Sequence, residues 1–256
     1  TNGLLIDERW CELFRAHGVK LGLSLDGPAA LHDRHRLNRR GGGTHERVMR
    51  GVARLQRHGI PFHVIAVVTA DTLAHADAFA TFFAELAPSE LGLNFDEAEG
   101  EHKTSSLQGR EAAHADFLRA LLPWVQSGRL NVRELAQART LVTRPLPTYR
   151  WAGADWPDNA QVLPYALLNV AHDGRFGTFS PELLGQPSAT FGDFSIGNVH
   201  DTPLLDALRT PAFERLWREI RDGVAHCRDT CAHYAWCGGG SPVNKLYEAG
   251  SLAAGE

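Results

Sequence analysis

Cysteine is scarce in this chain of 256 residues: there are four, unevenly spaced. Small secreted proteins that rely on disulfides carry more cysteines at regular spacing, so that class is excluded and a reducing cytoplasm is the expected setting. No apolar run approaches the roughly 18–20 residues that span a bilayer. The first residues also lack the basic segment and long apolar core of a signal peptide. We therefore expect a cytoplasmic protein with no membrane partner.

An excess of positive charge is absent as well. The formal net charge is −4 and the isoelectric point is near 6.3. Proteins whose main partner is nucleic acid usually present a basic surface, so we expect no nucleic acid partner. Apolar residues make up 43% of the chain, which is enough for an ordinary buried core. The length allows one large domain, or one domain with an appendage.

Three of the four cysteines fall within one short segment near the C-terminal end. They are Cys227, Cys231 and Cys237, followed at once by three glycines at 238–240 and then by Ser241 and Pro242. Thiols this close together usually hold a metal. Glycines have no side chain, so they allow a backbone to pass close to a bulky inorganic centre. We interpret the segment as most of the cradle of an iron–sulfur cluster.

The spacing alone leaves zinc open. A pair four positions apart suits a zinc site, and His226 and His233 lie beside the cysteines and could complete it. A cubane cluster needs four ligands, and three local ones are visible. Cys11 stands apart, next to Trp10 in the first expected helix, and we predict that it is a core residue.

The first half of the chain alternates between strand and helix patterns. Expected helices cover 7–16, 44–58 and 73–86, and expected strands cover 19–25, 61–68 and 91–95. A polar loop is expected over 32–43. This alternation with short connections predicts parallel strands joined by right-handed crossovers.

The second half is less regular. A long helix is expected over 108–127, and the proline-containing stretch 129–164 has weak periodicity and is expected to be a crossover linker. Residues 165–171 and 175–179 flank an Asp-Gly turn, which predicts a β-hairpin. A short strand at 196–199 and helices at 204–208 and 211–221 precede the cysteine segment.

Polar side chains follow the expected strands. Ser24, at the end of the first strand, is followed by Leu-Asp-Gly-Pro and then by His32, Asp33 and Arg36. Ligands bind at the carboxyl ends of parallel strands, and a hydroxyl with a guanidinium suits a small ligand that carries carboxylate and hydroxyl groups. The same residues could also form a turn with solvated charges.

Two acidic stretches are further candidates. The third strand ends in a group that either contacts substrate or forms a solvated loop: Asn94, Asp96, Glu97 and Glu99. Glu182 is the one acidic residue in the otherwise apolar sequence Phe-Ser-Pro-Glu-Leu-Leu-Gly. It is a candidate ligand or proton acceptor, with a surface carboxylate as the alternative.

Taken in order, these motifs resemble the radical SAM/SPASM peptide maturases. Thr1-Asn2-Gly3 looks like the end of their third barrel strand, the Ser24 motif matches their next strand end, and the cysteine segment looks like their C-terminal SPASM region. The stretch 94–100 and the Phe-Ser-Pro-Glu-Leu-Leu-Gly sequence look most like the subgroup that forms cyclophane cross-links in ribosomally made precursor peptides.

The resemblance implies an α/β fold, with a partial (β/α) radical SAM barrel that lacks its N-terminal part and then a small SPASM domain. The expected boundaries are 1–128 for the barrel, 129–164 for the linker and 165–256 for the SPASM domain. The three-cysteine motif that holds the catalytic [4Fe-4S] cluster is absent from this sequence. We expect its ligands outside this chain, and a native protein that extends beyond both ends.

The resemblance also implies roles for individual residues. Ser24 and Arg36 match positions that contact S-adenosylmethionine, with Asn2 near that site and Leu93 lining the adenosyl pocket. The three clustered cysteines match one auxiliary [4Fe-4S] cluster, whose fourth ligand stays open between a cysteine downstream of this chain, Glu182 and a histidine. Another auxiliary cluster is expected to be missing, because Ser180 and Ser241 stand where two of its cysteines would be.

The activity implied is the use of a 5′-deoxyadenosyl radical to install a carbon–carbon cross-link. The implied partners are a precursor peptide and an electron donor such as a ferredoxin or flavodoxin. Two alternatives remain at this point. One is an oxidation of a cysteine or serine side chain, as in the sulfatase maturases. The other is a non-catalytic homologue that binds a peptide partner and uses zinc at the cysteines as a structural staple.

Overall fold

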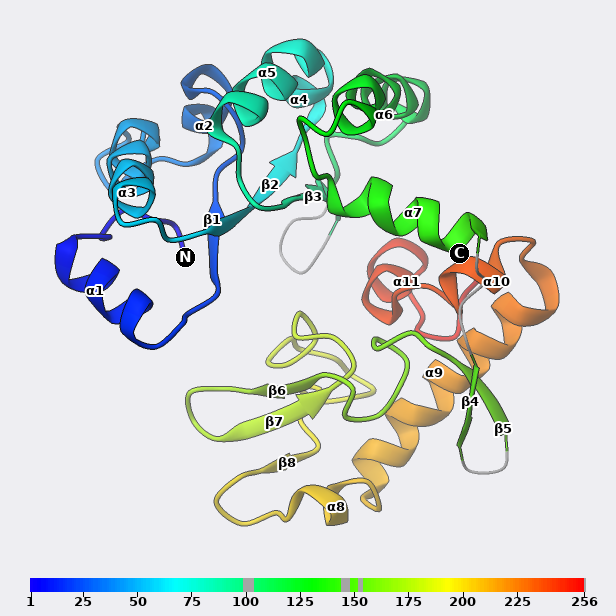
Figure 1. Cartoon of the computed structure of the whole chain (residues 1–256). Coiled ribbons are helices and arrows are strands. Elements are labelled where there is room, and N and C mark those ends of the chain that lie inside the picture. The colour runs from blue at the N-terminus through cyan, green and yellow to red at the C-terminus, as the bar shows by residue number, and fades with distance from the viewer. Residues whose placement is uncertain (99–103, 144–147, 152–153, 256) are drawn as a thin grey trace. The chain divides into compact units, whose positions relative to one another are not determined.

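The chain folds into two compact units. The computed structural model describes residues 1–98, 104–143, 148–151 and 154–255 (Figure 1). The first unit contains residues 1–96 and 105–139, and the second contains residues 97–104 and 140–256. The main break between the units, at residues 139 and 140, falls between the predicted boundaries at 128 and 164. No helix in the described ranges is long and apolar enough to cross a membrane.

A three-stranded parallel sheet forms the centre of the first unit. Its strands are β1 (Leu21–Ser24), β2 (Phe62–Val68) and β3 (Leu91–Phe95), in the order β1-β2-β3. Leu23 pairs with Val64, and Ala66 pairs with Leu93. The predicted parallel alternation is thus confirmed. Every second residue of β2 is buried, so one face of the sheet carries the core and the other stays half-buried.

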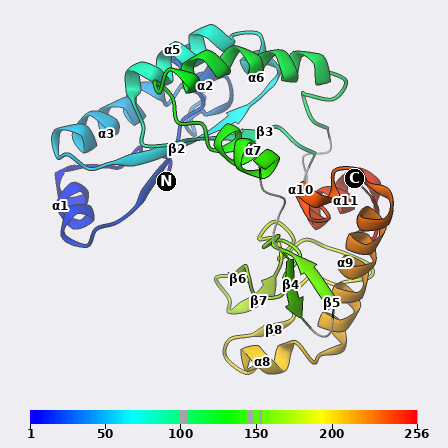
Figure 2. The same ribbon diagram turned by 45° about the vertical axis from the view of Figure 1, so that its right-hand side comes forward.

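Helices cover the buried face. In chain order the helices of this half of the chain are α1 (Glu8–Ala16), α2 (Ala29–His35), α3 (His45–Arg57), α4 (Ala70–Leu73), α5 (Ala76–Leu86), α6 (Glu111–Gln126) and α7 (Arg133–Thr143). Helices α2 to α6 lie along the same side of the sheet in both ribbon views (Figures 1 and 2). Phe79 packs edge-on against Phe83 and Phe117, with ring centroids 4.7 and 5.4 Å apart. Burial of each such ring stabilises the unit by about 2 kcal/mol.

Two local expectations for this half needed correction. Helix α2 occupies part of the predicted loop 32–43. The predicted helix 73–86 corresponds to α5, which begins at Ala76, and Leu73 ends the separate short helix α4. Between the two helices, the ring Nδ1 of His75 bonds the Asp71 carbonyl oxygen at 2.7 Å, and its backbone N–H bonds the Thr72 carbonyl oxygen at 3.0 Å. In α1, Trp10 and Leu13 are exposed, and Cys11 is the buried residue. Cys11 is therefore in the core, as predicted, and burial raises the pKa of its thiol.

Regular structure also occupies much of the stretch predicted to be a linker. It contains all of α7, and then the antiparallel pair β4 (Thr148–Trp151) and β5 (Ala154–Pro157). Just before α7, Val132 is fully buried and forms a parallel bridge with Leu91 on the edge of the sheet. Such pairing joins residues far apart in sequence, so local periodicity gave no sign of it.

The second unit is built on a small antiparallel sheet and a long helix. The sheet contains β6 (Leu168–Val170), β7 (Arg175–Thr178) and β8 (Gly197–Asn198), which confirms the predicted hairpin. The helices are α8 (Leu204–Ala207), α9 (Pro211–Thr230), α10 (Tyr234–Cys237) and α11 (Pro242–Ala249). Phe179 stacks on Phe213 and Trp217 in the core. Helix α9 runs past the predicted end at 221 and carries Cys227.

Candidate functional site

The half-buried face of the parallel sheet carries polar side chains. Strand alternation places Ser24, His63 and Asn94 on this face, opposite the helices. Ser24 pairs with Ile65 in register and ends β1. Its backbone N–H donates to the Thr1 carbonyl oxygen at 2.9 Å, and this bond brings the Thr1–Gly3 turn beside it. Asn2 lies in that turn, where its Oδ1 accepts from the Leu4 N–H at 3.2 Å.

Leu93 lies on the other face. Its side chain is 3% exposed and belongs to the core under the helices. Ser24 and Leu93 therefore do not present their side chains to the same space. The backbone N–H of Leu93 donates to Glu134 Oε2 at 2.8 Å. A contact of Leu93 with a ligand on the Ser24 face would have to be made by its backbone.

Two glycines make room on the polar face. A Cβ atom on Gly22 would lie 2.4 Å from His63 Nε2, and one on Gly92 would lie 2.8 Å from Arg133 Cζ. The imidazole and the guanidinium therefore lie directly over glycine backbone. Arg133 Nε also donates to Glu134 at 2.7 Å. Arg133 was missed at the sequence level, where a glycine inside a strand was the available signal of a close approach.

The segment after β1 holds an ion pair with a buried carboxylate. Arg36 Nη2 donates to Asp26 Oδ1 at 2.9 Å, and Arg36 Nε donates to Asp26 Oδ2 at 2.5 Å. Asp26 Oδ1 also accepts from the backbone N–H of Val67 on β2 at 2.9 Å. Asp26 is buried, with its side chain 8% exposed, and the Arg36 side chain is 29% exposed. A two-pronged pair of this kind fixes the plane of the guanidinium.

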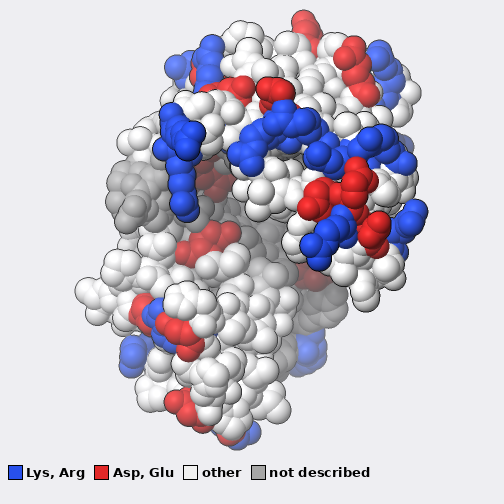
Figure 3. All heavy atoms as spheres, turned by 90° about the vertical axis from the view of Figure 1, so that its left-hand side faces the viewer, with Lys and Arg blue, Asp and Glu red and all other residues white. Residues whose placement is uncertain are grey.

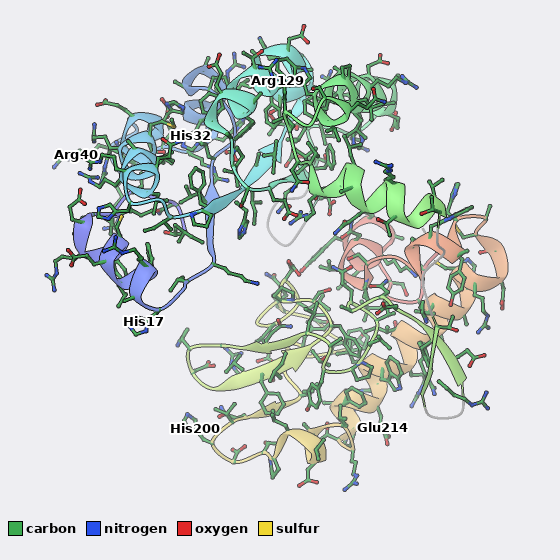
Figure 4. The ribbon with its side chains drawn as sticks, viewed as in Figure 1. His17, His32, Arg40, Arg129, His200 and Glu214 are labelled. Atoms are coloured by element: carbon green, nitrogen blue, oxygen red, sulfur yellow. The ribbon has the colours of Figure 1, made fainter. Side chains whose placement is uncertain are left out.

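The side chains of His32 and Thr44 are hydrogen-bonded to the backbones of Asp26 and Arg36. His32 is fully buried, on α2 where that helix packs on α3 (Figure 4). Its Nδ1 lies 3.2 Å from the Asp26 backbone nitrogen, and its Nε2 lies 3.1 Å from Thr44 Oγ1. Thr44 Oγ1 donates to the Arg36 carbonyl oxygen at 2.7 Å. Burial lowers the pKa of His32 below its ordinary value, which favours the neutral ring.

The start of helix α3 is capped by the side chain of Asp33. Asp33 Oδ1 accepts from the backbone N–H groups of Thr44 and His45, each at 2.8 Å. The Thr44 hydroxyl makes no capping bond. Asp33 therefore stabilises the start of α3, and the Thr44 hydroxyl is free to bond the Arg36 backbone.

The acidic residues after β3 are held in loop contacts. Asp96 Oδ2 accepts from the Ser106 backbone N–H at 2.7 Å. Glu97 Oε2, in the second unit, accepts from Asn244 Nδ2 at 2.8 Å. Glu99 lies outside the described residues. Within the described part of this stretch, the carboxylates act as ordinary partners of neighbouring donors.

The surface of the first unit is electrically mixed. Arg57 Nη2 donates to Glu8 at 2.8 Å, and Arg50 pairs with Glu46 one helical turn away. Figure 3 shows basic and acidic side chains adjoining over this unit. Because the pairs neutralise one another, the face that Figure 3 shows offers no uniform basic surface.

The clustered cysteines lie at a helix end and the turn after it. Cys227 is buried on the last turns of α9, and the Cys231 N–H donates to its carbonyl oxygen at 2.8 Å. Cys237 ends α10, and its carbonyl oxygen accepts from Asn159 Nδ2 at 3.2 Å. Burial raises the pKa of the nearby Tyr234 phenol.

The three glycines after Cys237 have a structural role. All three have positive φ, at 61°, 92° and 68°, which other residues adopt only with strain. A Cβ on Gly239 would lie 3.0 Å from Val224 Cγ2 of α9. In this structure the glycines thus let the turn pack closely against a helix.

Cys227 is hydrogen-bonded to a buried lysine. Lys245 of α11 is 2% exposed, and its Nζ donates to Cys227 Sγ at 3.2 Å and to the Gly223 carbonyl oxygen at 3.1 Å. A buried amino group needs hydrogen-bond partners, and the sulfur and the carbonyl oxygen supply them. Among the described residues, no group of three or more His, Cys, Asp or Glu side chains is arranged to hold a metal ion. The sulfur donors suit a cluster chemically, but as placed they do not form its ligand set.

The segment after β7 contains buried oxygens without partners. Ser180 is 1% exposed, and neither its Oγ nor Glu182 Oε2 has a hydrogen-bond partner in the described part of the chain. Phe179, next to Ser180, has a positive φ of 79°. Ser241 differs, because its hydroxyl caps α11 by accepting from the Asn244 N–H at 3.5 Å. An unpaired buried oxygen is costly, so Ser180 and Glu182 stand out as sites for a further group.

Comparisons with known proteins identify a family for the first part of the chain. Residues 1–83 match the family model of the Radical SAM superfamily. These residues are part of a radical SAM domain. Over all of this chain and 63% of the relative, the sequence is 37% identical to an uncharacterised protein of Synechocystis.

The radical SAM domain also relates the chain to the anaerobic sulfatase-maturating enzymes. The chain is 35% identical to the serine-type enzyme of Bacteroides thetaiotaomicron over 124 aligned residues. The aligned region covers 46% of this chain and 30% of that protein. A solved structure described as "Native anSMEcpe with bound AdoMet and Cp18Cys peptide" matches with a TM-score of 0.71 at 20% identity, over 94% of this chain and 64% of that one. At this identity the match shows the fold.

Proposed function

We propose that the full-length protein is a radical SAM enzyme that installs a cyclophane-type carbon–carbon cross-link in a ribosomally made precursor peptide. The observation that carries the proposal is the radical SAM domain, with Ser24 and the anchored Arg36 at the end of its first described strand. The cyclophane reaction is supported by the Phe-Ser-Pro-Glu-Leu-Leu-Gly stretch. A peptide substrate is supported by the matching structure described with a bound peptide.

The proposed cofactor site lies on the half-buried sheet face. The Ser24 hydroxyl stands at the carboxyl edge of β1, and Arg36 keeps three N–H groups beyond the two that Asp26 accepts. These donors suit the carboxylate and hydroxyl groups of S-adenosylmethionine, with Asn2 and the Leu93 backbone as neighbours. Together with a [4Fe-4S] cluster whose ligands we expect outside this chain, S-adenosylmethionine supplies a 5′-deoxyadenosyl radical when bound.

The chain's own residues would then orient the peptide and receive a proton. A cross-link between two carbon atoms removes two hydrogens from the peptide. One would leave as a hydrogen atom to the 5′-deoxyadenosyl radical, and the other as a proton whose electron would pass to the proposed auxiliary [4Fe-4S] cluster. Glu182 is the proposed proton acceptor, because Oε2 is buried without a hydrogen-bond donor from the described residues. The second unit would act as the SPASM domain, with residues 165–256 as its extent.

An auxiliary [4Fe-4S] cluster at Cys227, Cys231 and Cys237 is part of the proposal. Its support is the chemistry of three thiols within eleven positions of the sequence; the described structure does not bring them together as a ligand set. The working setting would be a reducing cytoplasm with a ferredoxin or flavodoxin as electron donor. Neither nucleic acid nor membrane takes part in this reaction.

Iron analysis tests the cluster part of the proposal. The full-length protein and its Cys227→Ala, Cys231→Ala and Cys237→Ala variants would be purified without oxygen and assayed for iron and acid-labile sulfide. Each variant should lose the iron that belongs to the auxiliary cluster. Cys11→Ala should keep that iron, because Cys11 is a core residue of the other unit. A colourless protein that contains zinc would instead favour a peptide-binding homologue.

A second candidate function is the oxidation of a serine or cysteine side chain, which the identity to the serine-type sulfatase-maturating enzyme favours. Mass spectrometry of a treated precursor peptide separates the two functions. A cross-link and a serine oxidised to an aldehyde both lose two hydrogens, but the aldehyde reacts with a hydrazide probe. Loss of two hydrogens without hydrazide labelling supports the cross-link, and labelling supports side-chain oxidation.

A further inference from the structure

A continuous chain of hydrogen bonds runs behind the Asp26–Arg36 pair. It starts at the backbone N–H of Asp26, passes through the His32 ring and the Thr44 hydroxyl, and ends at the carbonyl oxygen of Arg36. Both intermediate side chains are buried, with exposures of 0% for His32 and 4% for Thr44. The chain therefore joins the backbones of the two residues whose side chains form the ion pair.

The direction of each bond is fixed by chemistry. The Asp26 backbone nitrogen can act as a donor but not as an acceptor, so His32 Nδ1 must accept and cannot carry a proton. The ring proton is then on Nε2 and is donated to Thr44 Oγ1. Thr44 in turn uses its one hydroxyl proton for the Arg36 carbonyl oxygen. This arrangement requires a neutral His32 in a single tautomer, in agreement with the lowered pKa.

The position of Arg36 is therefore fixed at three points. Its backbone N–H donates to the His32 carbonyl oxygen at 3.0 Å, and its carbonyl oxygen accepts from Thr44. Its guanidinium donates two hydrogen bonds to the Asp26 carboxylate. Asp26 is itself tied to β2 through Val67. Guanidinium placement accurate to a fraction of an ångström matters for binding a carboxylate, and such placement needs supporting hydrogen bonds.

We propose that His32 and Thr44 are positioning residues that hold Arg36 so that its free N–H groups face the carboxylate of S-adenosylmethionine. This inference rests on the proposed function, which assigns Arg36 to that cofactor. The two residues touch neither cofactor nor substrate, and they act through the backbone of Arg36. Removal of the Thr44 hydroxyl should weaken recognition of the carboxylate and leave recognition of the adenosine part intact.

Binding measurements with two probes test this separation. S-Adenosylmethionine has the amino acid carboxylate, whereas 5′-methylthioadenosine keeps the adenosine and lacks that carboxylate. Dissociation constants for both would be measured on the full-length protein with its cluster, purified without oxygen. Thr44→Val keeps the shape and removes the hydroxyl, so it should weaken S-adenosylmethionine about tenfold and 5′-methylthioadenosine less than about twofold. Thr44→Ser keeps the hydroxyl and should restore the native ratio.

Asp33→Asn is the matched control. It disturbs the cap of α3 in the same loop but leaves the Thr44–Arg36 bond in place, so it should lower stability without changing the ratio of the two dissociation constants. His32→Asn gives a second test, because its side-chain oxygen can still accept from Asp26 but cannot reach Thr44. It should behave as Thr44→Val does.

Arg36→Gln distinguishes a failure of this inference from a failure of the proposed cofactor site. If Arg36→Gln weakens S-adenosylmethionine selectively and Thr44→Val does not, the positioning role is wrong and the cofactor site stands. If Arg36→Gln itself leaves both dissociation constants unchanged, the assignment of Arg36 to the cofactor is wrong, and the inference is wrong with it. Equal weakening of both probes by Thr44→Val would indicate a general loss of structure and would also overturn the inference.

Discussion

Two of the Asp–Arg pairs, Asp26–Arg36 in the first unit and Asp193–Arg175 in the second, differ in burial and in the number of their partners. Asp26 in the first unit is 8% exposed, accepts two donors from Arg36 and also bonds the backbone of β2. Asp193 in the second unit is 38% exposed, and its partner Arg175 is shared with Asp173. Solvent screens the second pair and not the first, so the first should matter far more to stability.

The surroundings of the pairs differ in the same way. Behind Asp26 and Arg36, the His32 and Thr44 side chains have protein partners that complete a chain of hydrogen bonds. After β7, Ser180 Oγ and Glu182 Oε2 lie buried without partners among the described residues. The first site is thus organised by its own side chains, whereas the second has polar groups that the described protein atoms do not satisfy. Substitutions that remove one polar group at a time measure how much each group contributes to stability.

Asp26→Asn should give the largest loss of stability. It leaves the Arg36 charge half-buried without its counter-ion, and breaking such a pair costs about 3 kcal/mol. Urea denaturation would measure the free energy of unfolding, with Asp193→Asn as the matched control at the exposed pair. A loss below about 1 kcal/mol for Asp26→Asn would show that the buried pair is no stronger than the exposed one.

The buried His32 should make the first unit sensitive to mild acid. Burial lowers its pKa in the folded state, and Arg36 and His45 lower it further while Asp26 and Asp33 oppose them. The unfolded chain then takes up the proton first, so stability is retained above pH 6.5 or so and falls as the pH decreases below it.

Stability should fall between pH 7.5 and pH 5.5, the range in which the unfolded chain takes up this proton and the folded chain resists it. Urea midpoints of the native protein and of His32→Asn at both values would measure it. The variant should be less stable at pH 7.5 and should lose less on acidification. His45 also has a pKa lowered by burial, so His45→Asn serves as a second reference. An unchanged pH dependence in His32→Asn would assign the effect to other groups.

Local patterns were enough to predict the parallel strands, the hairpin and the helix that begins after Asp7. They also drew attention to Ser24 and Arg36, because a strand end and the turn residues that follow it are adjacent in the sequence. They did not show that Asp26 and Thr44 would organise Arg36, since those bonds join residues eight to ten positions apart through the tertiary fold.

Non-local contacts explain the remaining differences. The side chain of Leu93 faces the core because strand register, set by pairing with Ala66, decides its face. Arg133 reaches the sheet over Gly92, forty-one positions earlier in the chain. The cysteines lie close together in sequence, but their spacing could not predict that Lys245 would contact Cys227.

The exposed Asp193–Arg175 pair should contribute less to the free energy of unfolding, and this contribution should be lost in acid. Hydrogen bonds from Ser195, and then from Arg175, lower the pKa of Asp193 to about 2. Because this carboxyl is more than a third exposed, screening limits its contribution to about 1 kcal/mol or less. That contribution is present above about pH 4 and is lost as the pH falls from about 4 towards 2. Chemical shift titration of the Asp193 carboxyl carbon would measure the pKa, and a value near 4 would contradict this prediction.

Ser180→Ala should have the smallest effect and the opposite sign. The Ser180 hydroxyl is buried without a partner among the described residues, so its removal ends a desolvation cost and leaves no other group unpaired. We expect the free energy of unfolding to rise by about 0.5 kcal/mol, whereas Thr44→Ala, which removes a bonded hydroxyl, should lower it. Urea denaturation of both variants would measure the difference. A loss of stability in Ser180→Ala would mean that this hydroxyl does have a partner in the folded protein, and the contrast between the two regions would then disappear.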